Sequence, residues 1–160
     1  MLDAQPPAST SDDPSGSAVP IRKAADLTLV SEIMAREVVA VPPELGIEAL
    51  ETLFAKNGIS GVPVVDATGN PLGVVSKSDL LACRSAASAA STKVRDIMTP
   101  TTFFLSENES IAKAAGLMAF EGVHRVPVLG QRGQVVGMIS PLDVMRWLAR
   151  ECGYTIGNRR

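Results

Sequence analysis

The chain has 160 residues, 46% of them hydrophobic, so it can bury a core as one compact domain or as two small ones. Its formal net charge is −2 and its pI is about 5.4, which argues against a general nucleic-acid-binding protein because such proteins carry a basic surface. No apolar run reaches about 18 residues, and the N-terminus lacks a basic stretch followed by an apolar one. We therefore expect neither a membrane span nor a secretion signal, and we predict a cytoplasmic protein.

Cysteine and histidine content argues against disulfide and metal chemistry. The two cysteines, Cys83 and Cys152, form no CxxC motif, and His124 is the single histidine. We predict that both thiols are reduced and that the chain holds no metal site.

The N-terminal segment 1–20 is rich in Pro, Ser, Ala and Asp and has almost no large apolar residues. Such a segment cannot offset the entropy of ordering, so we predict a disordered tail. Residues 21–34 are compatible with helix and lead into the patterned part of the chain.

The patterned part is an internal repeat. A shift of 64 residues aligns Gly58–Asp79 with Gly122–Asp143 without a gap. The chain therefore contains two copies of one unit, roughly residues 30–81 and 94–145. Because about 50 residues form a marginal domain alone, we expect the copies to share a core. The identical pairs include Val30/Val94, Ile33/Ile97, Met34/Met98, Ile47/Ile111, Gly58/Gly122, Val62/Val126, Pro63/Pro127, Val64/Val128, Gly69/Gly133, Gly73/Gly137, Ser76/Ser140 and Asp79/Asp143.

The first copy is predicted to run strand, helix, strand, strand, helix. Apolar residues at helical spacing indicate the first helix, and Asn57-Gly58 is expected to end it. The Ala/Ser-rich stretch 82–93 either extends the second helix or is a flexible connection. In order, the predicted elements are a strand at Val38–Val41, a helix over 47–57, strands at Val62–Val65 and Leu72–Val75 around a turn at 66–70, and a helix from Ser76 through Leu81.

The second copy repeats this order, and it places the chain in the mixed α+β class. We divide the chain into the tail (1–20), the first repeat with its lead-in (21–88), the second repeat (89–153) and a C-terminal tail (154–160). The predicted elements are strands at Thr102–Leu105, Val126–Leu129 and Val135–Ile139, a helix with Ile111, Ala114, Ala115 and Met118 on one face, and a helix from Ser140-Pro141 to about Cys152-Gly153.

Three motifs occur in both copies: Ile-Met at the entry, GVPVVD and HRVPVL at the middle strand, and GVVSKSD and GMISPLD before the last helix. With their equal spacing, they resemble the CBS domain (the cystathionine-β-synthase repeat) present as a tandem pair, a Bateman module. The second copy departs from that family at Gly130, where an Asp is frequent, and at Ser106, where Pro is common. Both are turn positions.

The resemblance implies two pseudo-symmetric β-α-β-β-α repeats packed sheet to sheet, with two clefts between them. Related modules bind adenosine-containing ligands there, such as AMP, ADP, ATP or S-adenosylmethionine, and act as sensors for an effector protein. No other cofactor is implied. Such modules also pair through their helices, so a homodimer is expected, with Val144, Trp147 and Leu148 as a candidate apolar face.

Ser76 and Asp79 stand at the start of a predicted helix. A Ser three residues before an Asp is a capping box, in which each side chain satisfies an N–H of the first turn. The same geometry allows Asp79 to accept hydrogen bonds from ribose hydroxyls beside the positive end of the helix. The resemblance favours the ribose role, and the two roles are compatible.

His124 and Arg125 replace Ser60 and Gly61 of the first copy. They are either exposed polar residues before a strand or phosphate ligands, as basic residues at this position are in the family. Arg offers permanently charged, bidentate recognition of phosphate, and His adds a contact that strengthens on protonation.

In the family, each cleft takes its Ser/Asp motif from one copy and its other ligands from the other copy. Only the first of the two clefts implied here has cations for a phosphate. It would combine Ser76, Ser78 and Asp79 with Thr102, Phe103, Val123, His124 and Arg125. The second, weaker cleft would combine Ser140 and Asp143 with Val38, Val39, Ile59, Ser60 and Gly61.

The leading hypothesis is a regulatory module that binds an adenosine nucleotide and acts on a partner. The alternative is an interaction scaffold with vestigial sites. A small enzyme is disfavoured because the sequence has no acid/base pair around a nucleophile, no Walker lysine motif and no metal cluster.

Overall fold

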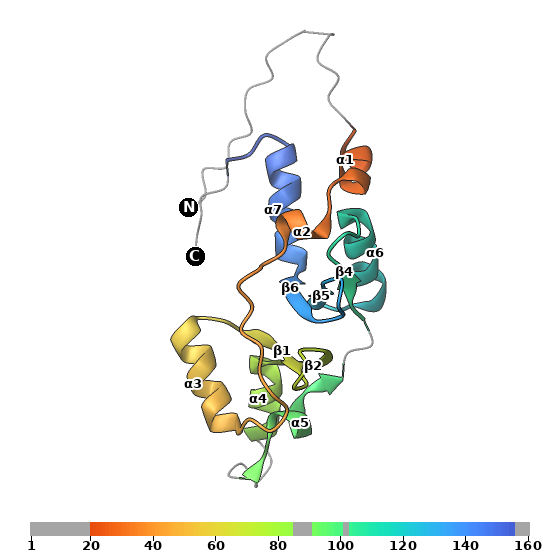
Figure 1. Cartoon of the computed structure of the whole chain (residues 1–160). Coiled ribbons are helices and arrows are strands. Elements are labelled where there is room, and N and C mark those ends of the chain that lie inside the picture. Colours follow the sequence, from red (N-terminus) through yellow and green to blue (C-terminus); the bar gives the residue numbers. More distant parts are fainter. Residues whose placement is uncertain (1–19, 85–90, 101–102, 156–160) are drawn as a thin grey trace, which may run out of the picture.

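The computed structural model describes residues 20–84, 91–100 and 103–155 (Figure 1). Most of the predicted N-terminal tail, the boundary at residues 88 and 89, and residues 156–160 lie outside this part. The fold is mixed α+β, as predicted. Its elements are α1 (Ile21–Leu27), α2 (Val30–Ile33), α3 (Ile47–Asn57), β1 (Gly61–Val65), β2 (Pro71–Ser76), α4 (Lys77–Arg84), α5 (Val94–Ile97), β3 (Thr99–Pro100), β4 (Leu105–Ser106), α6 (Ile111–Glu121), β5 (Val126–Leu129), β6 (Val135–Ile139) and α7 (Pro141–Glu151).

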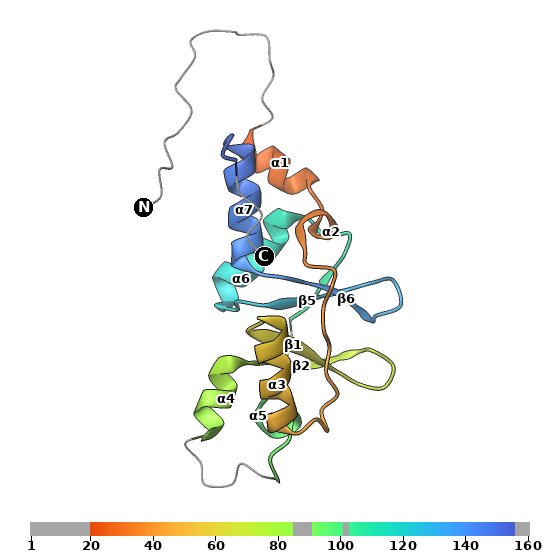
Figure 2. The same ribbon diagram turned by 90° about the vertical axis from the view of Figure 1, so that its left-hand side faces the viewer.

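Each copy contributes an antiparallel hairpin and two helices. Strand β1 pairs with β2, and β5 pairs with β6. The hairpins of the two copies extend in the same direction, away from α4 and α6 (Figure 2). Helix α3 ends at Gly58, whose φ of 62° is left-handed and so favours glycine, which confirms the predicted helix end.

The first strand of each copy is shorter than predicted. Of Val38–Val41, only Val41 pairs: its N–H donates to the Pro63 carbonyl (3.0 Å), and its carbonyl accepts from the Val65 N–H (3.0 Å). Extending this parallel ladder towards Val39 would need an N–H from Pro63, which proline lacks. Pro127 has the same effect in the second copy, where β4 begins only at Leu105.

The lead-in of each copy packs on the other copy. Helix α2 precedes the first copy but contacts α7 and β6 of the second, and α5 precedes the second copy but contacts α4 of the first. Figure 1 shows orange α2 beside blue α7, and green α5 next to light-green α4. Each sheet also gains backbone pairing from the lead-in of the other copy, a strand in the first sheet and an isolated bridge in the second. Strand β3 pairs with β2, and Ala35 pairs with Met138 on β6.

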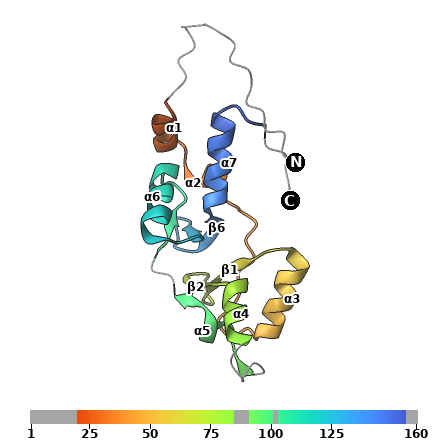
Figure 3. The same ribbon diagram turned by 180° about the vertical axis from the view of Figure 1, so that it is seen from behind.

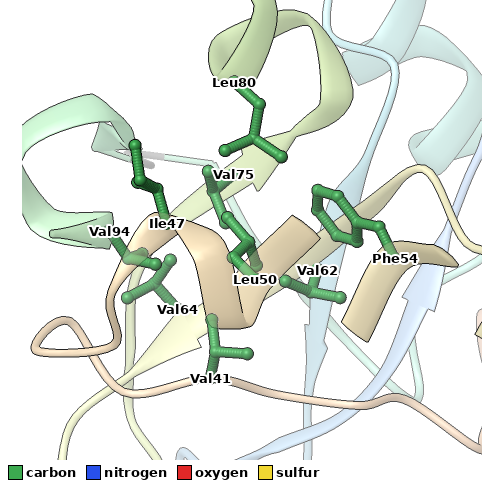
Figure 4. Packing of buried hydrophobic residues seen from close by; sticks show 9 residues of the cluster. All are labelled: Val41, Ile47, Leu50, Phe54, Val62, Val64, Val75, Leu80 and Val94. Atoms are coloured by element: carbon green, nitrogen blue, oxygen red, sulfur yellow. The ribbon is translucent and has the colours of Figure 1, made fainter. Parts of the chain in front are cut away.

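Two core clusters result, rather than the single shared core expected. Val94, from the second lead-in, belongs to the first cluster; Val30 and Met34, from the first lead-in, belong to the second. Each copy therefore contributes apolar residues of its lead-in to the core of the other copy. This increases the apolar surface that each small unit buries. The first cluster, drawn in Figure 4, consists of Val41, Ile47, Leu50, Phe54, Val62, Val64, Val75, Leu80 and Val94.

Glycines at equivalent positions make this exchange possible. A Cβ on Gly73 would lie 2.7 Å from the Thr99 carbonyl oxygen, and one on Gly137 would meet the Met34 sulfur and the Ala35 carbonyl oxygen. The lead-in backbone can therefore lie against the hairpin only where the side chain is absent.

The two hairpin turns are stabilised by hydrogen bonds to different side chains. In the first copy, the Asp66 carboxylate accepts from the Thr68 N–H (2.8 Å), the Thr68 hydroxyl (2.6 Å) and the Asn70 N–H (2.9 Å). In the second, Gln134 Oε1 accepts from the Arg132 N–H (3.1 Å). The turns also touch, because the Val135 N–H donates to the Gly69 carbonyl (3.1 Å).

Gly73→Ala should destabilise the fold by about 1–3 kcal/mol, because the added methyl group meets backbone that cannot move alone. Gly116→Ala is the control: nothing lies within 4 Å of its Cβ position in α6, so it should be neutral or stabilising by up to about 1 kcal/mol. Urea denaturation measures the free energy of unfolding of both variants. Equal effects would contradict the close approach of the Thr99 backbone to Gly73.

Thr68→Val should raise the pKa of Asp66. The Thr68 hydroxyl, followed by the Asn70 N–H, lowers this pKa from its ordinary value of 3.8 to about 2. A depressed carboxylate pKa contributes stability above the ordinary value, and that stability is lost as pH falls from about 4 towards 2. A carbon-13 NMR titration of the carboxyl group measures the midpoint. Thr68→Ser, which keeps the hydroxyl, should preserve it, and a wild-type midpoint near 3.8 would contradict the hydrogen-bond pattern.

Candidate functional site

A cleft of about 360 Å³ lies between the two copies, in the size range typical of ligand pockets. Seven of the eight residues predicted for the first cleft line it; the eighth, Thr102, lies outside the described residues. The cleft is lined by Val74, Ser76, Ser78, Asp79, Thr99, Pro100, Phe103, Val123, His124 and Arg125.

Three lining residues were not predicted: Val74, Thr99 and Pro100. Val74 lies on β2 and pairs with Thr99 on β3. They line the cleft because the second lead-in adds its strand to the first sheet, and the repeat alone gives no sign of that exchange. The Ile-Met pair just before Thr99 was the available signal, since it marked the lead-in as part of the repeat.

Ser76 and Asp79 form a compact polar group at the start of α4. Asp79 Oδ2 accepts from the Ser76 N–H (2.7 Å) and the Ser76 hydroxyl (2.6 Å), and Ser76 Oγ lies 2.7 Å from Ser78 Oγ. Asp79 Oδ1 has no hydrogen-bond partner among the described residues. One carboxylate oxygen therefore holds the helix start, and the other can accept a hydrogen bond from a ligand.

The carboxylate of the equivalent aspartate in the second copy has an additional partner. Asp143 Oδ2 accepts from the Ser140 N–H (2.9 Å) and hydroxyl (2.6 Å), which repeats the first-copy geometry. Its Oδ1, however, lies 3.9 Å from the Arg146 guanidinium. Position 82, the counterpart of Arg146, is alanine, so Asp79 has no such cation at that spacing on its helix.

Arg125 brings positive charge to the cleft from the second copy. It is half-buried just before β5 and makes no ion pair with any described residue. Its guanidinium donates to the Ser60 hydroxyl of the first copy and lies against Gly61. His124 beside it is exposed and lines the same cleft. Two groups able to carry positive charge thus lie in one cleft with the Asp79 carboxylate.

The second predicted site differs from its expected composition. A cleft of about 120 Å³ contains Val38, Val39, Ile59 and Gly61 from the predicted set. Ser140, Asp143 and Ser60 are not among its described lining residues, and the Ser60 hydroxyl is bonded to Arg125 of the first cleft. No described lysine, arginine or histidine lines this cleft, whose other lining residues are Ala35, Glu37, Val62 and Met138.

The described residues contain no group of three or more His, Cys, Asp and Glu side chains placed to hold a metal ion. Nor do they include a helix with the length and apolar character needed to cross a membrane.

Comparison with known sequences identifies the repeat. A model of the CBS domain matches residues 30–85 and 94–150. Inosine-5'-monophosphate dehydrogenase of Thermoplasma acidophilum is 31% identical over 113 residues, which are 71% of this chain and 22% of the dehydrogenase. The chain therefore spans about a fifth of the length of that relative.

Comparison with solved structures agrees. CBSX2 of Arabidopsis thaliana, solved in complex with AMP, has a TM-score of 0.68 and 25% identity, covering 77% of this chain and 97% of CBSX2. The CBS domain of the bacterial CNNM/CorC family Mg²⁺ transporter has a TM-score of 0.71 and 26% identity, covering 83% of this chain and 80% of that domain. With both copies matched by the family model and the fold matched along most of the chain, this protein belongs to the CBS domain family as a tandem pair.

Proposed function

We propose that this chain is a regulatory module, not an enzyme, that binds an adenosine nucleotide in the cleft of about 360 Å³. The observation that carries the proposal is that Asp79 and Arg125 line the same cleft. Asp79 has one carboxylate oxygen without a hydrogen-bond partner, and Arg125 has no ion pair, among the described residues. These two groups match the two polar parts of a nucleotide. The complex of CBSX2 with AMP supports the same ligand class.

Each part of the nucleotide has a proposed partner. Asp79 Oδ1 accepts hydrogen bonds from the ribose hydroxyls, and Arg125 with His124 binds the phosphate. Val74, Phe103 and Val123 supply apolar contacts for the adenine ring. The unpaired guanidinium favours AMP, ADP or ATP over S-adenosylmethionine, because the sulfonium of the latter adds a positive charge. The smaller second cleft, without a lining cation among the described residues, holds a nucleotide weakly or not at all.

The proposed module passes its signal to an effector protein and works in the cytoplasm, where thiols such as those of Cys83 and Cys152, both free, stay reduced. An interaction scaffold with vestigial sites is the second candidate. The small size of the second cleft favours it, because one of the two family sites has little room.

We also propose a homodimer through the helices, with a contact face different from the one expected. Trp147 is 7% exposed and packs within its own chain, whereas Phe120 is 89% exposed. Leu142 and Met145 on α7 and Leu81 on α4 are exposed as well. Helices α4 and α6 lie on the same side of the molecule, away from the hairpins (Figure 2), and Figure 3 shows the arrangement from behind. Exposed apolar side chains on surface helices are typical of a contact surface.

Asp79→Asn should weaken AMP binding by about tenfold or more, because a hydrogen bond to a charged group contributes about 1.5–3 kcal/mol. Asp143→Asn is the matched control, since it alters the same helix-start geometry in the other copy. Isothermal titration calorimetry measures the affinity, and thermal melts check the fold of both variants. Loss of binding in Asp143→Asn alone would mean that the ligand binds at the start of α7 and would contradict the proposed site. If wild type binds none of AMP, ADP, ATP and S-adenosylmethionine, the scaffold candidate replaces this proposal.

Phe120→Glu combined with Met145→Glu should shift the protein from dimer to monomer, because charged groups would be buried in the proposed contact. Sedimentation velocity measures the assembly. The control Lys56→Glu changes an exposed side chain at the position equivalent to Phe120 in the first copy. A dimer that survives the double substitution would exclude this face.

A further inference from the structure

We propose that Ser60 and Gly61 of the first copy position Arg125 of the second and thereby give the cleft its preference for phosphorylated over unphosphorylated nucleosides. We call these two residues the arginine seat. The inference rests on the proposed function and deepens it. It gives Ser60, which the sequence placed in the second cleft, a role in the first, and it gives Gly61, which lines the second cleft, a contact with the cation of the first.

The absence of a side chain at Gly61 lets Arg125 approach the backbone of the first copy closely. A Cβ built on Gly61 would lie 3.0 Å from Arg125 Nε and 3.1 Å from both Cδ and Cζ. A Cβ at residue 61 would therefore require the guanidinium end of Arg125 to shift by a few tenths of an ångström, and a longer side chain would require a larger shift.

The seat also has a polar anchor. The Ser60 hydroxyl accepts a hydrogen bond from Arg125 Nη2. A guanidinium has five N–H donors, so this bond leaves others for a phosphate. Holding the long side chain in one place before the ligand arrives lowers the conformational entropy lost on binding.

The seat is joined to the Asp79 end of the cleft through backbone. The Ser60 carbonyl accepts from the N–H of Lys77, the first residue of α4 (3.0 Å). Gly61 pairs with Ser76 across β1 and β2, and Ser76 holds Asp79. The position of the cation and that of the carboxylate are therefore set by the same few residues of the first copy.

The 64-residue offset explains why only one cleft has this cation. Ser60 and Gly61 are the counterparts of His124 and Arg125, so Arg125 lies against its own equivalent position. The Arg125 side chain lies 3.0–3.1 Å from the Cβ position of residue 61, so an arginine at residue 61 would bring a second positive charge close to the first.

The experiment compares AMP with adenosine by isothermal titration calorimetry on the full chain. Wild type should bind AMP more tightly, and Arg125→Ala should remove the difference. Ser60→Ala should weaken AMP binding by about fivefold to tenfold, the value of one ordinary hydrogen bond, and leave adenosine binding unchanged. Gly61→Ala should act in the same direction. Ser60→Thr, which keeps the hydroxyl, should retain the wild-type preference.

Two measurements separate positioning from a general effect on the fold. In the Arg125→Ala background, Ser60→Ala should cause no further loss, because the seat acts only through Arg125. In the ligand-free protein, the NMR signal of the Arg125 Nε–H should show restricted motion that Ser60→Ala relieves.

The outcomes are distinguishable. The inference is overturned if Arg125→Ala removes the preference while Ser60→Ala and Gly61→Ala leave it intact, or if Ser60→Ala strengthens AMP binding, which would make Ser60 a competitor of the phosphate. Equal weakening of AMP and adenosine by Ser60→Ala would also overturn it. If wild type binds neither ligand, the proposed function is wrong and the inference falls with it.

Discussion

The close approach of each lead-in to the hairpin of the other copy is the contact on which the rest of the molecule depends. It requires glycine at positions 73 and 137, where a Cβ would overlap the incoming backbone or side chain. It completes both sheets and both cores. It also builds the cleft: Thr99 and Pro100 line the space between the copies because β3 is added to β2. Fold and candidate site thus have one physical origin.

Duplication gives the two copies the same backbone plan, and a few side chains make them chemically different. Ser76–Asp79 and Ser140–Asp143 form the same hydrogen bonds at the start of α4 and α7. At residue 77 a lysine N–H reaches the Ser60 carbonyl, but its counterpart Pro141 has no N–H to donate. A symmetric framework can therefore hold one cleft lined by cations and a second with no lining cation among the described residues.

Much of the fold could be predicted from the sequence because the pattern that indicates each element occurs in both copies. The hairpins and the helices α3 and α6 follow from apolar spacing and glycine ends, and seven predicted residues share one cleft. The exchange of lead-ins could not be predicted, since a lead-in bears the same apolar residues whichever copy it packs on. Nor could the reach of Arg125 to Ser60, because a contact across copies depends on how the two hairpins face each other. The prediction that Trp147 belongs to a dimer contact face was wrong for a related reason. The sequence of an apolar helical face does not reveal whether that face is covered by its own chain, as Trp147 is.

The exchanged lead-ins mean that the repeated unit of the sequence is not the unit of cooperative unfolding. A fragment beginning at Val94 would carry an α5 whose core partners were left behind, and its own core would lack Val30 and Met34. Opening either copy strips apolar residues from the other, so the free energies of the two openings are coupled. A ligand bound in the cleft between the copies would therefore stabilise both cores at once.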